Sequence, residues 1–584
     1  MKKIRRTLAI AMAVTMAVSM LFGITASANP IGSIVITPPS TLSVNGVEFR
    51  AFKVFDLITD GGSAHHYILN PAFAGFNDYP NSATETLHDY IRGMQNTNGD
   101  LDPTRQNELY ALARALWRWS EDPVNISGPN VLLATGTASN VTFSGVEYGY
   151  YLIAGSGTPT RDRLPDELVI SMAMLATVNS EREPTQIALK ADVPEIKKYV
   201  SNHHVGDNNL TNTPGVGLDG LPNHWQKWTD VSITDEVQFL LRSTVPNTLG
   251  YQYYSYQVHD RLSRGLTYDR ILSVTAVDTA TTNPGPNVPL ALNAATNGYT
   301  LDVKTRGTDG YQHFTVQVNS ETILRLAPTY VIEIVYVAIL NENAVIEDIG
   351  NPNYVYLEYS NNPNYLWTGV PGEDDEGPTG DTPDDDAWVY TYRLRVFKFA
   401  QGPDGPQDRI PLANAEFELW LRDSQDDLVA VAEFNLVSGV YVFDGFVLAA
   451  TDDSKLVSNA LGEINIDGLD EGTYSLVEIA PPAGYYPLED PVDVVIKNAN
   501  WADPPNGAAQ FIAWLNLNRG VINSGDSRAN GLPVVGILNV TGAEFPSVGG
   551  MGRTLFMIAG VAVMGSAIVG MVITTARRKK RTQA

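Results

Sequence analysis

The apolar residues of this chain follow two periods. Alternation of apolar and polar positions, which is typical of strands with one buried face, recurs along the 584 residues, for example at 49–57 and 237–241, and a longer strand is indicated at 330–340. The spacing i, i+3, i+4, i+7, which is typical of helices, occurs at 87–94 and 109–116. The pattern predicts a mainly β protein with helical insertions in its first part.

Turns and a linker divide the strand-rich region into three segments, at 29–188, 192–369 and 388–541. The stretch GEDDEGPTGDTPDDD at 372–386 contains no apolar residue, and it predicts an acidic linker over 370–387. Calcium binding is the alternative use of these carboxylates, but the spacing of a calcium loop is absent. Short strands separated by turns predict tandem Ig-like β-sandwich domains.

The two ends of the chain carry export and membrane signals. Basic residues precede an apolar stretch at 8–22 and the small residues Ala26-Ser27-Ala28, which predicts a signal peptide over 1–28. Residues 554–576 form an uncharged run of 23 residues, long enough to cross a bilayer core of about 30 Å. The basic tail 577–584 would stay in the cytoplasm. An ordinary membrane anchor is one interpretation of this end.

Composition narrows the classes of function. Ten of the 39 basic residues lie at 1–28 or at 553–584, which leaves 29 against 65 acidic residues, and such a surface repels nucleic acid and anionic lipid. A hydrophobic content of 44% argues against disorder. The sequence contains no cysteine, so the exported part has neither disulfides nor thiolate chemistry. Any cross-link in this protein must use other side chains.

The pentad FPSVG precedes the apolar run and has a specific likeness. It resembles the LPXTG sorting signal of Gram-positive surface proteins, which also stands before an apolar span and a basic tail; its residues are Phe545, Pro546, Ser547, Val548 and Gly549. The resemblance implies that a sortase cysteine attacks the Val548 carbonyl and passes the acyl group to an amine. Phe545 and Val548 depart from the family motif, which leaves the sortase class open.

The last segment resembles a collagen-adhesin B-type module of sortase-assembled pilins. YSLVEIAPPAGY at 474–485 is similar to the E-box of that family, LRVFKF precedes it, and ILNV follows. The resemblance implies an isopeptide bond between Lys398 and Asn539, with Glu478 as proton shuttle. This chemistry requires burial, because an amine attacks a carboxamide only when it is neutral, and burial lowers the pKa of a lysine and raises that of a carboxylic acid.

The middle segment resembles the fimbrial isopeptide-formation domain, which is collagen-adhesin A-like. VPEIKKYV, the stretch that ends YQVHDRLSRGLTYD, and VYLEYSNNP carry this likeness. The reactive side chains must share the inward face of their strands, and this parity favours Lys198 over Lys197 and Asn361 over Asn362. Asp260 matches the catalytic acid of the family. The resemblance therefore implies a second triad of Lys198, Asp260 and Asn361.

The first segment has no lysine in its opening strand, so we expect no isopeptide bond there. Lys190 lies at the junction before the middle segment, where backbone pilins carry the lysine that the sortase links to the next subunit. Its surroundings lack the usual residues of that motif, and a simple linker lysine is the alternative.

These resemblances imply a structural subunit of a pilus. Sortase would join identical subunits head to tail through FPSVG and Lys190, and the finished pilus would be anchored to peptidoglycan on the cell surface, after a membrane-held precursor. We expect no cofactor, no metal and no conventional enzyme activity. A wall-anchored adhesin or minor pilin that binds a host or surface polymer is the first alternative. An anchored enzyme is the second, but neither HExxH nor GxSxG occurs in the sequence.

Overall fold

The structure is a computed structural model, and it is mainly β, as the sequence predicts. It describes residues 30–38, 44–59, 65–98, 100–122, 124–125, 131–137, 139–156, 173–189, 193–201, 218–222, 224–346, 350–365, 377–405, 408–498, 509–512 and 534–540. The chain forms two compact units. The first comprises residues 1–193, 246–255 and 359–381, and the second comprises residues 194–245, 256–358 and 382–584.

The first unit contains two sheets and the predicted helices. One sheet has the order β5 (Val141–Glu147), β1 (Ile31–Thr37), β8 (Thr185–Ala188). The other has the order β3 (His65–Leu69), β2 (Glu48–Thr59), β6 (Gly149–Ser156), β7 (Met174–Val178), and β4 (Val131–Thr135) also pairs with β2. The helices α2 (Leu87–Arg92) and α3 (Gln106–Glu121) lie where the helical spacing predicts them.

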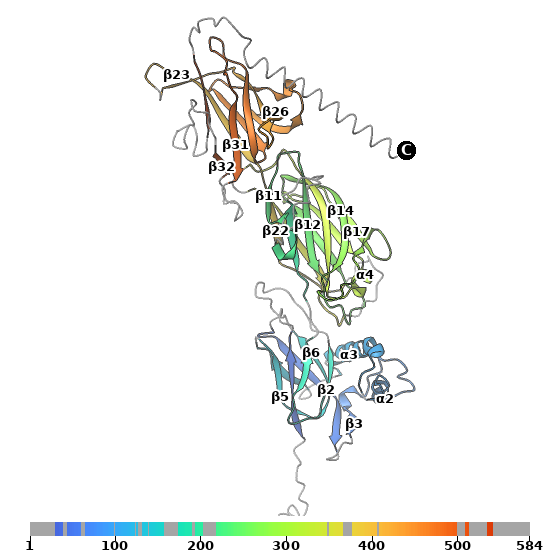
Figure 1. The fold of residues 1–584 in the computed structure, drawn as a ribbon. Coiled ribbons are helices and arrows are strands. Elements are labelled where there is room, and N and C mark those ends of the chain that lie inside the picture. Colours follow the sequence, from blue (N-terminus) through green and yellow to red (C-terminus); the bar gives the residue numbers. More distant parts are fainter. Residues whose placement is uncertain are drawn as a thin grey trace, which may run out of the picture. The chain divides into compact units, whose positions relative to one another are not determined.

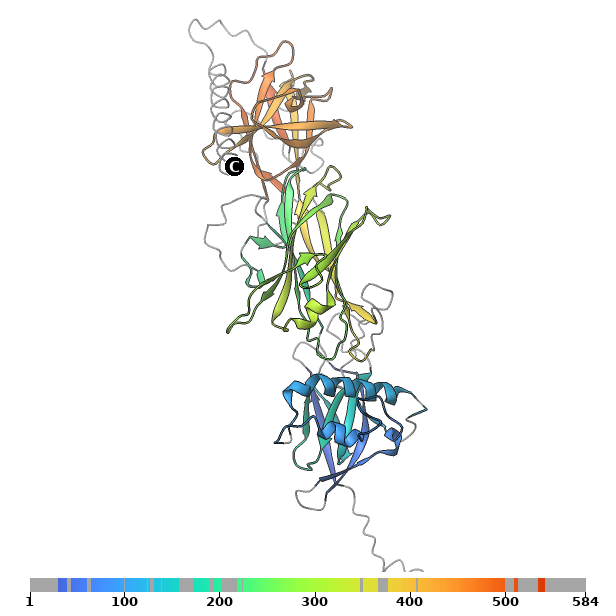
Figure 2. The same cartoon turned by 90° about the vertical axis from the view of Figure 1, so that its right-hand side faces the viewer.

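Strand β2 explains this layered arrangement, because both of its faces are buried. Phe49 and Ala51 belong to the core between the two sheets, whereas Phe52 and Val54 face a second core that α2 and α3 line. Alternation along the strand sends successive side chains to opposite faces. Figure 2 shows α3 running across the strands of this unit, where it contacts β6 and β7. Apolar side chains on both faces of β2 thus account for a packed layer on either side of it.

The second unit begins with a module of two facing sheets, which we call the middle module (Figure 1). The first sheet has the order β10 (Trp225–Gln226), β9 (Ile196–Ser201), β12 (Glu236–Thr244), β19 (Tyr330–Leu340), β14 (Leu266–Asp278), β15 (Val288–Pro289). The second has the order β11 (Trp228–Asp230), β22 (Asp385–Tyr390), β20 (Asn351–Ser360), β13 (Tyr256–Leu262), β18 (Gln312–Val318), β17 (Gly298–Val303), β16 (Ala291–Leu292). A short helix, α4 (Ser320–Arg325), precedes β19.

The last module of the second unit is one extended sheet system. Its order is β24 (Arg409–Pro411), β23 (Tyr392–Gln401), β29 (Glu463–Leu469), β27 (Val440–Val447), β26 (Leu428–Val437), β25 (Glu416–Arg422), β30 (Gly472–Ala480), β31 (Val492–Asn498), β32 (Ala509–Ile512). In addition β28 (Leu456–Val457) pairs with β25, and β33 (Val535–Asn539) pairs with β23. One continuous apolar core, which includes Phe417, Ile466 and Leu476, fills the module.

Part of the acidic stretch that the sequence assigns to a linker forms strands. Within it lie β21 (Thr379–Asp381) and the start of β22, and β22 pairs with β20 and with β11. The physical reason is a distant cation: Lys227 donates from Nζ to the Asp385 carboxylate at 2.6 Å and to the Asp386 carbonyl at 3.1 Å. Charges that look solvated in the sequence are therefore paired across the fold.

The predicted leader and sorting segments cannot be compared with this fold. The signal peptide 1–28, the pentad 545–549, the apolar run 554–576 and Lys190 all lie outside the described residues. Within the part of the chain that the structure does describe, no helix combines the length and the apolar character needed to span a membrane.

Candidate functional site

The last module brings together the three residues of the first predicted triad. Lys398 lies on β23, Glu478 on β30 and Asn539 on β33. Strands β23 and β33 pair in parallel, with Ala400 opposite Asn539, so the lysine and the asparagine approach each other from neighbouring strands. Residues distant in sequence thus meet because the module pairs its first strand with its last.

The contacts among these three side chains form a closed network. Lys398 Nζ donates to Asn539 Oδ1 and lies 2.9 Å from Glu478 Oε1. Asn539 Nδ2 donates to Glu478 Oε1 at 3.1 Å. The side chains of Lys398 and Glu478 are fully buried, and the Phe417 ring lies 5.1 Å from the ammonium. One carboxyl group therefore touches both the nitrogen that would attack and the nitrogen that would leave.

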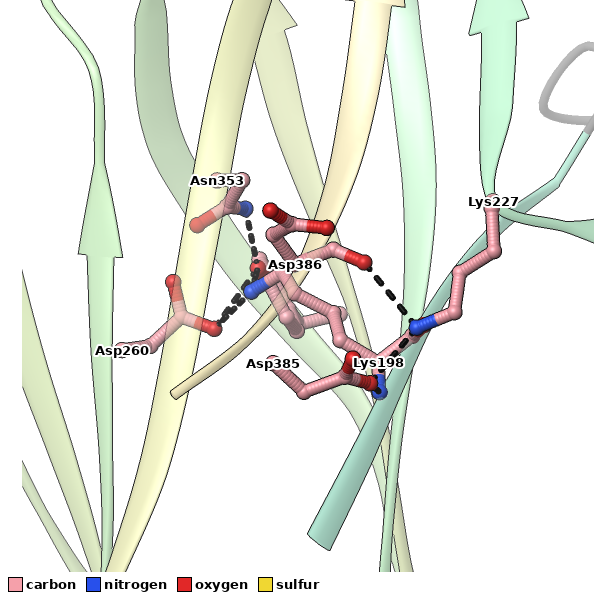
Figure 3. Close-up of polar contacts among 7 residues, drawn as sticks. Lys198, Lys227, Asp260, Asn353, Asp385 and Asp386 are labelled. Carbon is pink, nitrogen blue, oxygen red and sulfur yellow. Dashed lines mark hydrogen bonds and ion pairs between the residues drawn. The ribbon is translucent and has the colours of Figure 1, made fainter. Parts of the chain in front are cut away.

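A second buried network occupies the middle module, between its two sheets (Figure 3). Lys198 on β9 and Tyr336 on β19 come from one sheet, whereas Asp260 on β13 and Asn353 on β20 come from the other. All four residues are 0% exposed. Lys198 Nζ donates to Asp260 Oδ2 and, at 2.9 Å, to Tyr336 Oη. Tyr336 Oη donates to Asp260 Oδ2 at 3.0 Å, and Asn353 Nδ2 donates to Tyr336 Oη at 2.6 Å.

Burial shifts the protonation equilibria of this network in the direction that the chemistry needs. It lowers the pKa of Lys198 to about 8, although the neighbouring Asp260 carboxylate opposes the shift. Burial also raises the pKa of Asp260, against the effect of the lysine. Both shifts favour the neutral amine and the neutral acid over the ion pair. Lys197, by contrast, has a half-exposed side chain and pairs with Asp219 at 2.9 Å.

The asparagine of this network differs from the one that the sequence favours. Asn361 lies just beyond β20 and donates from Nδ2 to the Thr379 carbonyl at 2.8 Å. Asn353 has the same inward parity but lies eight residues earlier, which is about 26 Å along a strand. Asn351 is also buried, but its amide is bound to the backbone of Val345 and Val389. The strand thus carries two inward asparagines, and Asn353 is the one that contacts the Lys198 network.

A pair of charges supports the backbone next to Lys198. Asp385 Oδ2 accepts from the Lys198 backbone N–H at 2.7 Å and from Lys227 Nζ at 2.6 Å. Lys227 Nζ also donates to the Lys198 carbonyl at 2.8 Å (Figure 3). These bonds fix β9 against β22, and they hold the backbone of the buried lysine on both sides. No sequence motif singles out Lys227 or Asp385, because their partners come from separate strands.

The first unit offers no comparable network at its described lysine. Lys53 lies on β2 and pairs with Asp56 at 2.9 Å and with Glu147, and the side chains of both of these carboxylates are about half-exposed. Among the residues that the structure describes, no group of three or more histidine and carboxylate side chains could hold a metal ion.

Two family models match parts of this chain. The model of the Gram-positive pilin backbone subunit 2, Cna-B-like domain, matches residues 233–363, and the model of the SpaA prealbumin-like fold domain matches residues 405–503. The first match carries the description Cna-B-like, whereas the resemblance in the sequence implied an A-like module for this segment.

Several solved structures are similar to this chain. The T6 backbone pilin of serotype M6 Streptococcus pyogenes has a TM-score of 0.46 at 15% identity, over 80% of this chain and 80% of that chain. The full-length major pilin SpaD from Corynebacterium diphtheriae has 0.44 at 14% identity, over 88% and 98%. BcpA, the major pilin subunit of Bacillus cereus, has 0.38 at 13% identity, over 88% and 99%. The comparison with curated proteins gives no match. The two family matches therefore identify a Gram-positive pilin backbone domain within residues 233–363 and a SpaA prealbumin-like domain within residues 405–503 of this chain.

Proposed function

We propose that this chain is a structural pilin subunit that a sortase joins head to tail, and that two of its modules are each closed by an amide bond that they form themselves. The observation that carries the proposal is the buried network of Lys398, Glu478 and Asn539, in which an amine, a carboxamide and a carboxyl group are in mutual contact. An ordinary structural core does not need this combination. Burying a charged pair costs free energy, whereas burying apolar side chains in the same place does not.

The reaction proposed for the last module balances without a cofactor. The neutral Nζ of Lys398 attacks Cγ of Asn539, a bond forms between Nζ and Cγ, and the bond between Cγ and Nδ2 breaks. Glu478 takes one proton from Nζ and returns one to Nδ2, which leaves as ammonia. The contacts of Glu478 with both nitrogens support this role. The fold supplies the proximity that such a step requires.

In the middle module we propose the same bond between Lys198 and Asn353, with Asp260 as the acid. Asn353 replaces Asn361 in this proposal because its amide contacts the buried network through Tyr336. The lowered pKa of Lys198 supports a neutral nucleophile. Each bond would tie the first strand of a module to a strand near its end, β9 to β20 and β23 to β33. A pull on the ends of the chain would then load a covalent link rather than hydrogen bonds.

For assembly we propose that a sortase cleaves after Val548 and that Lys190 of the next subunit accepts the acyl group. The last subunit would be passed to an amine of peptidoglycan, which would leave the pilus on the cell surface. The matches to a pilin backbone domain and a SpaA domain support this placement. The two predicted end segments support export and a temporary membrane anchor.

Peptide mapping tests the two bonds. The full chain is digested with trypsin and analysed by tandem mass spectrometry, and we expect two branched peptides, one joining Lys398 to Asn539 and one joining Lys198 to Asn353. A branched peptide that joins Lys198 to Asn361 would refute the revised assignment. Unbranched peptides for all four residues would refute self-formed cross-links altogether.

Co-expression with a pilin sortase tests polymerisation. The wild-type chain should give a ladder of covalent multimers in denaturing gels, and Lys190→Arg should abolish it because a guanidinium does not resolve the acyl-enzyme. Lys53→Arg is the matched control, since Lys53 is the other lysine between residues 29 and 195 and the arginine keeps its ion pairs with Asp56 and Glu147. A ladder that persists in Lys190→Arg would exclude Lys190, and wall attachment without any ladder would favour a monomeric adhesin.

A further inference from the structure

The two buried networks differ in the groups that lie between the attacking and the leaving nitrogen. In the last module Glu478 reaches both reacting nitrogens by itself. In the middle module the acid is Asp260, which is one methylene shorter. It contacts Lys198 Nζ, but among the described residues no hydrogen bond joins it to Asn353. The gap between the acid and the leaving nitrogen is occupied by the hydroxyl of Tyr336.

Tyr336 touches every member of the middle network. Its Oη accepts from Lys198 Nζ at 2.9 Å and from Asn353 Nδ2 at 2.6 Å, and it donates to Asp260 Oδ2 at 3.0 Å. The ring is 0% exposed and is held between aromatic neighbours, with Phe239 stacked at 5.3 Å and Phe314 edge-on at 4.9 Å. The hydroxyl is therefore fixed in position and excluded from water.

We propose that Tyr336 is a catalytic residue of the middle module, which carries a proton between Asp260 and the nitrogen that leaves Asn353. The inference rests on the proposed amide bond between Lys198 and Asn353. It assigns to the middle module a relay of two groups where the last module uses one glutamate.

The proposed relay conserves protons and bonds. Before the attack, the Nδ2 lone pair of Asn353 is delocalised into the amide, so Nδ2 only donates to the tyrosine. When Lys198 Nζ attacks Cγ, the carbon becomes tetrahedral and Nδ2 becomes a basic amine that can accept from Oη across the same contact. Nζ gives one proton to Asp260, Asp260 gives one to Oη, and Oη gives one to Nδ2, which leaves as ammonia. The carboxyl and the phenol end as they began.

The surroundings suit this role. Burial, together with the nearby Asp260, raises the pKa of Tyr336, so its hydroxyl keeps its proton and can accept and donate in one step. Among the described residues, Asp260 Oδ1 and Asn353 Oδ1 are both buried without a hydrogen-bond partner. A proton on Asp260 Oδ1 would lower the cost of burying this oxygen, because the carboxyl would then carry no charge. The network is thus set up for a neutral acid rather than for a stable ion pair.

The test follows the rate of bond formation in the full chain. The chain is made by cell-free synthesis, samples are quenched in acid at intervals, and the two branched peptides are measured in each sample. The rate at which the Lys398–Asn539 bond forms in the same molecule serves as the internal reference. We compare wild type with Tyr336→Phe, and with Tyr256→Phe as matched control. Tyr256 is equally buried in the same module. Its hydroxyl contacts Ser243 at 2.6 Å and the Thr244 carbonyl at 3.1 Å, and the Tyr256→Phe variant loses both contacts.

In Tyr336→Phe the Lys198–Asn353 bond should form about 100-fold more slowly or not at all, the range expected when a general acid–base group is removed. In Tyr256→Phe it should form at nearly the wild-type rate. A Tyr336→Phe chain that links as fast as Tyr256→Phe would overturn the relay and leave the proposed function intact. A wild-type chain without this link would overturn both.

A double variant addresses the case in which Tyr336→Phe does not fold. Tyr336→Phe combined with Asp260→Glu fills the space of the lost hydroxyl with a methylene, and it lengthens the acid to match Glu478. This chain should link Lys198 to Asn353 faster than Tyr336→Phe alone, because the longer carboxyl can reach Nδ2 directly. A folded double variant that links no faster would contradict the role assigned to the tyrosine.

Discussion

Replacing Glu478 by glutamine should leave the last module folded but without its amide bond. Glutamine keeps the shape of the side chain, so it can still hydrogen-bond Asn539, but it cannot take a proton from Lys398. The module would then be held only by its apolar core and its strand pairing. The first expected result is a mass higher by one ammonia than in the linked chain, apart from the change of side chain itself.

The magnitude of the stability loss follows from the loop that the bond closes. Lys398 and Asn539 are 141 positions apart. Treated like a disulfide in the chain-entropy model, a link over this length contributes about 5 kcal/mol to the free energy of unfolding. For a domain of this size that corresponds to a melting temperature lower by roughly 10 to 20 °C. A buried lysine that keeps its charge would add to the loss, so the double variant Lys398→Met, Glu478→Gln isolates the bond itself.

The assay is scanning calorimetry of residues 29–541, in which the transition of the last module is compared among variants. Glu489→Gln is the matched control, because it removes an exposed carboxylate from the same module. The double variant should melt well below both the wild type and this control. If it lacks the bond but melts with the wild type, the entropic account of the cross-link is refuted. If Glu478→Gln still forms the bond, the role of Glu478 is refuted.

Three further predictions concern the second unit. Asn353→Ala should abolish the branched peptide of the middle module, whereas Asn361→Ala should retain it. Peptide mapping measures both variants, and the reverse pattern would assign the bond to Asn361. Asp385→Ala should lower the free energy of unfolding, measured by urea titration, by about 1–3 kcal/mol, because two hydrogen-bond donors lose their acceptor. The bond between Lys198 and Asn353 should still form in this variant. Loss of that bond would assign Asp385 to the reaction. Burial and the neighbouring Asp230 raise the pKa of Asp470 well above its usual 3.8, so its contribution to stability is present at low pH and is lost as the pH rises. Asp470→Asn should therefore raise the melting temperature at pH 7 and lose that advantage as the pH falls toward 3.8, and a lower melting temperature at pH 7 would contradict the shift.

Much of the fold can be predicted from the sequence, because the apolar residues of its strands and helices follow local periods. The spacing at 87–94 and 109–116 predicts α2 and α3, since one apolar face of each packs against the sheet of the first unit. The last triad could be proposed from the sequence because its residues stand in or beside motifs that resemble those of collagen-adhesin B-type modules. Parity then separates Lys198, which is buried, from Lys197, which pairs with a surface carboxylate.

Two features of the middle network needed the tertiary structure. Parity says which face of a strand a side chain occupies, but not how far along the strand the opposite sheet places its partner. Asn353 on β20 and Asn361 just beyond it have the same parity, and only the packing of the two sheets distinguishes them. Tyr336 lies in a strand rich in apolar residues, where a tyrosine gives no signal of chemistry.

The acidic stretch before the last module shows a related limit. Its composition indicates a solvated linker, yet Asp385 is bound by Lys227, which stands far away in the sequence. Pairing of this kind depends on which strands become neighbours, here β11 and β22. Composition therefore locates the boundary between modules only to within one strand.

The most direct test of the central claim is the intact mass of residues 29–541, measured for the wild type and for Lys198→Ala and Lys398→Ala. Self-formed bonds in both modules predict a wild-type mass lower than the sequence mass by two ammonias, and a deficit of one ammonia in each variant. A wild-type mass equal to that of the sequence would contradict the account, because neither network would then have reacted.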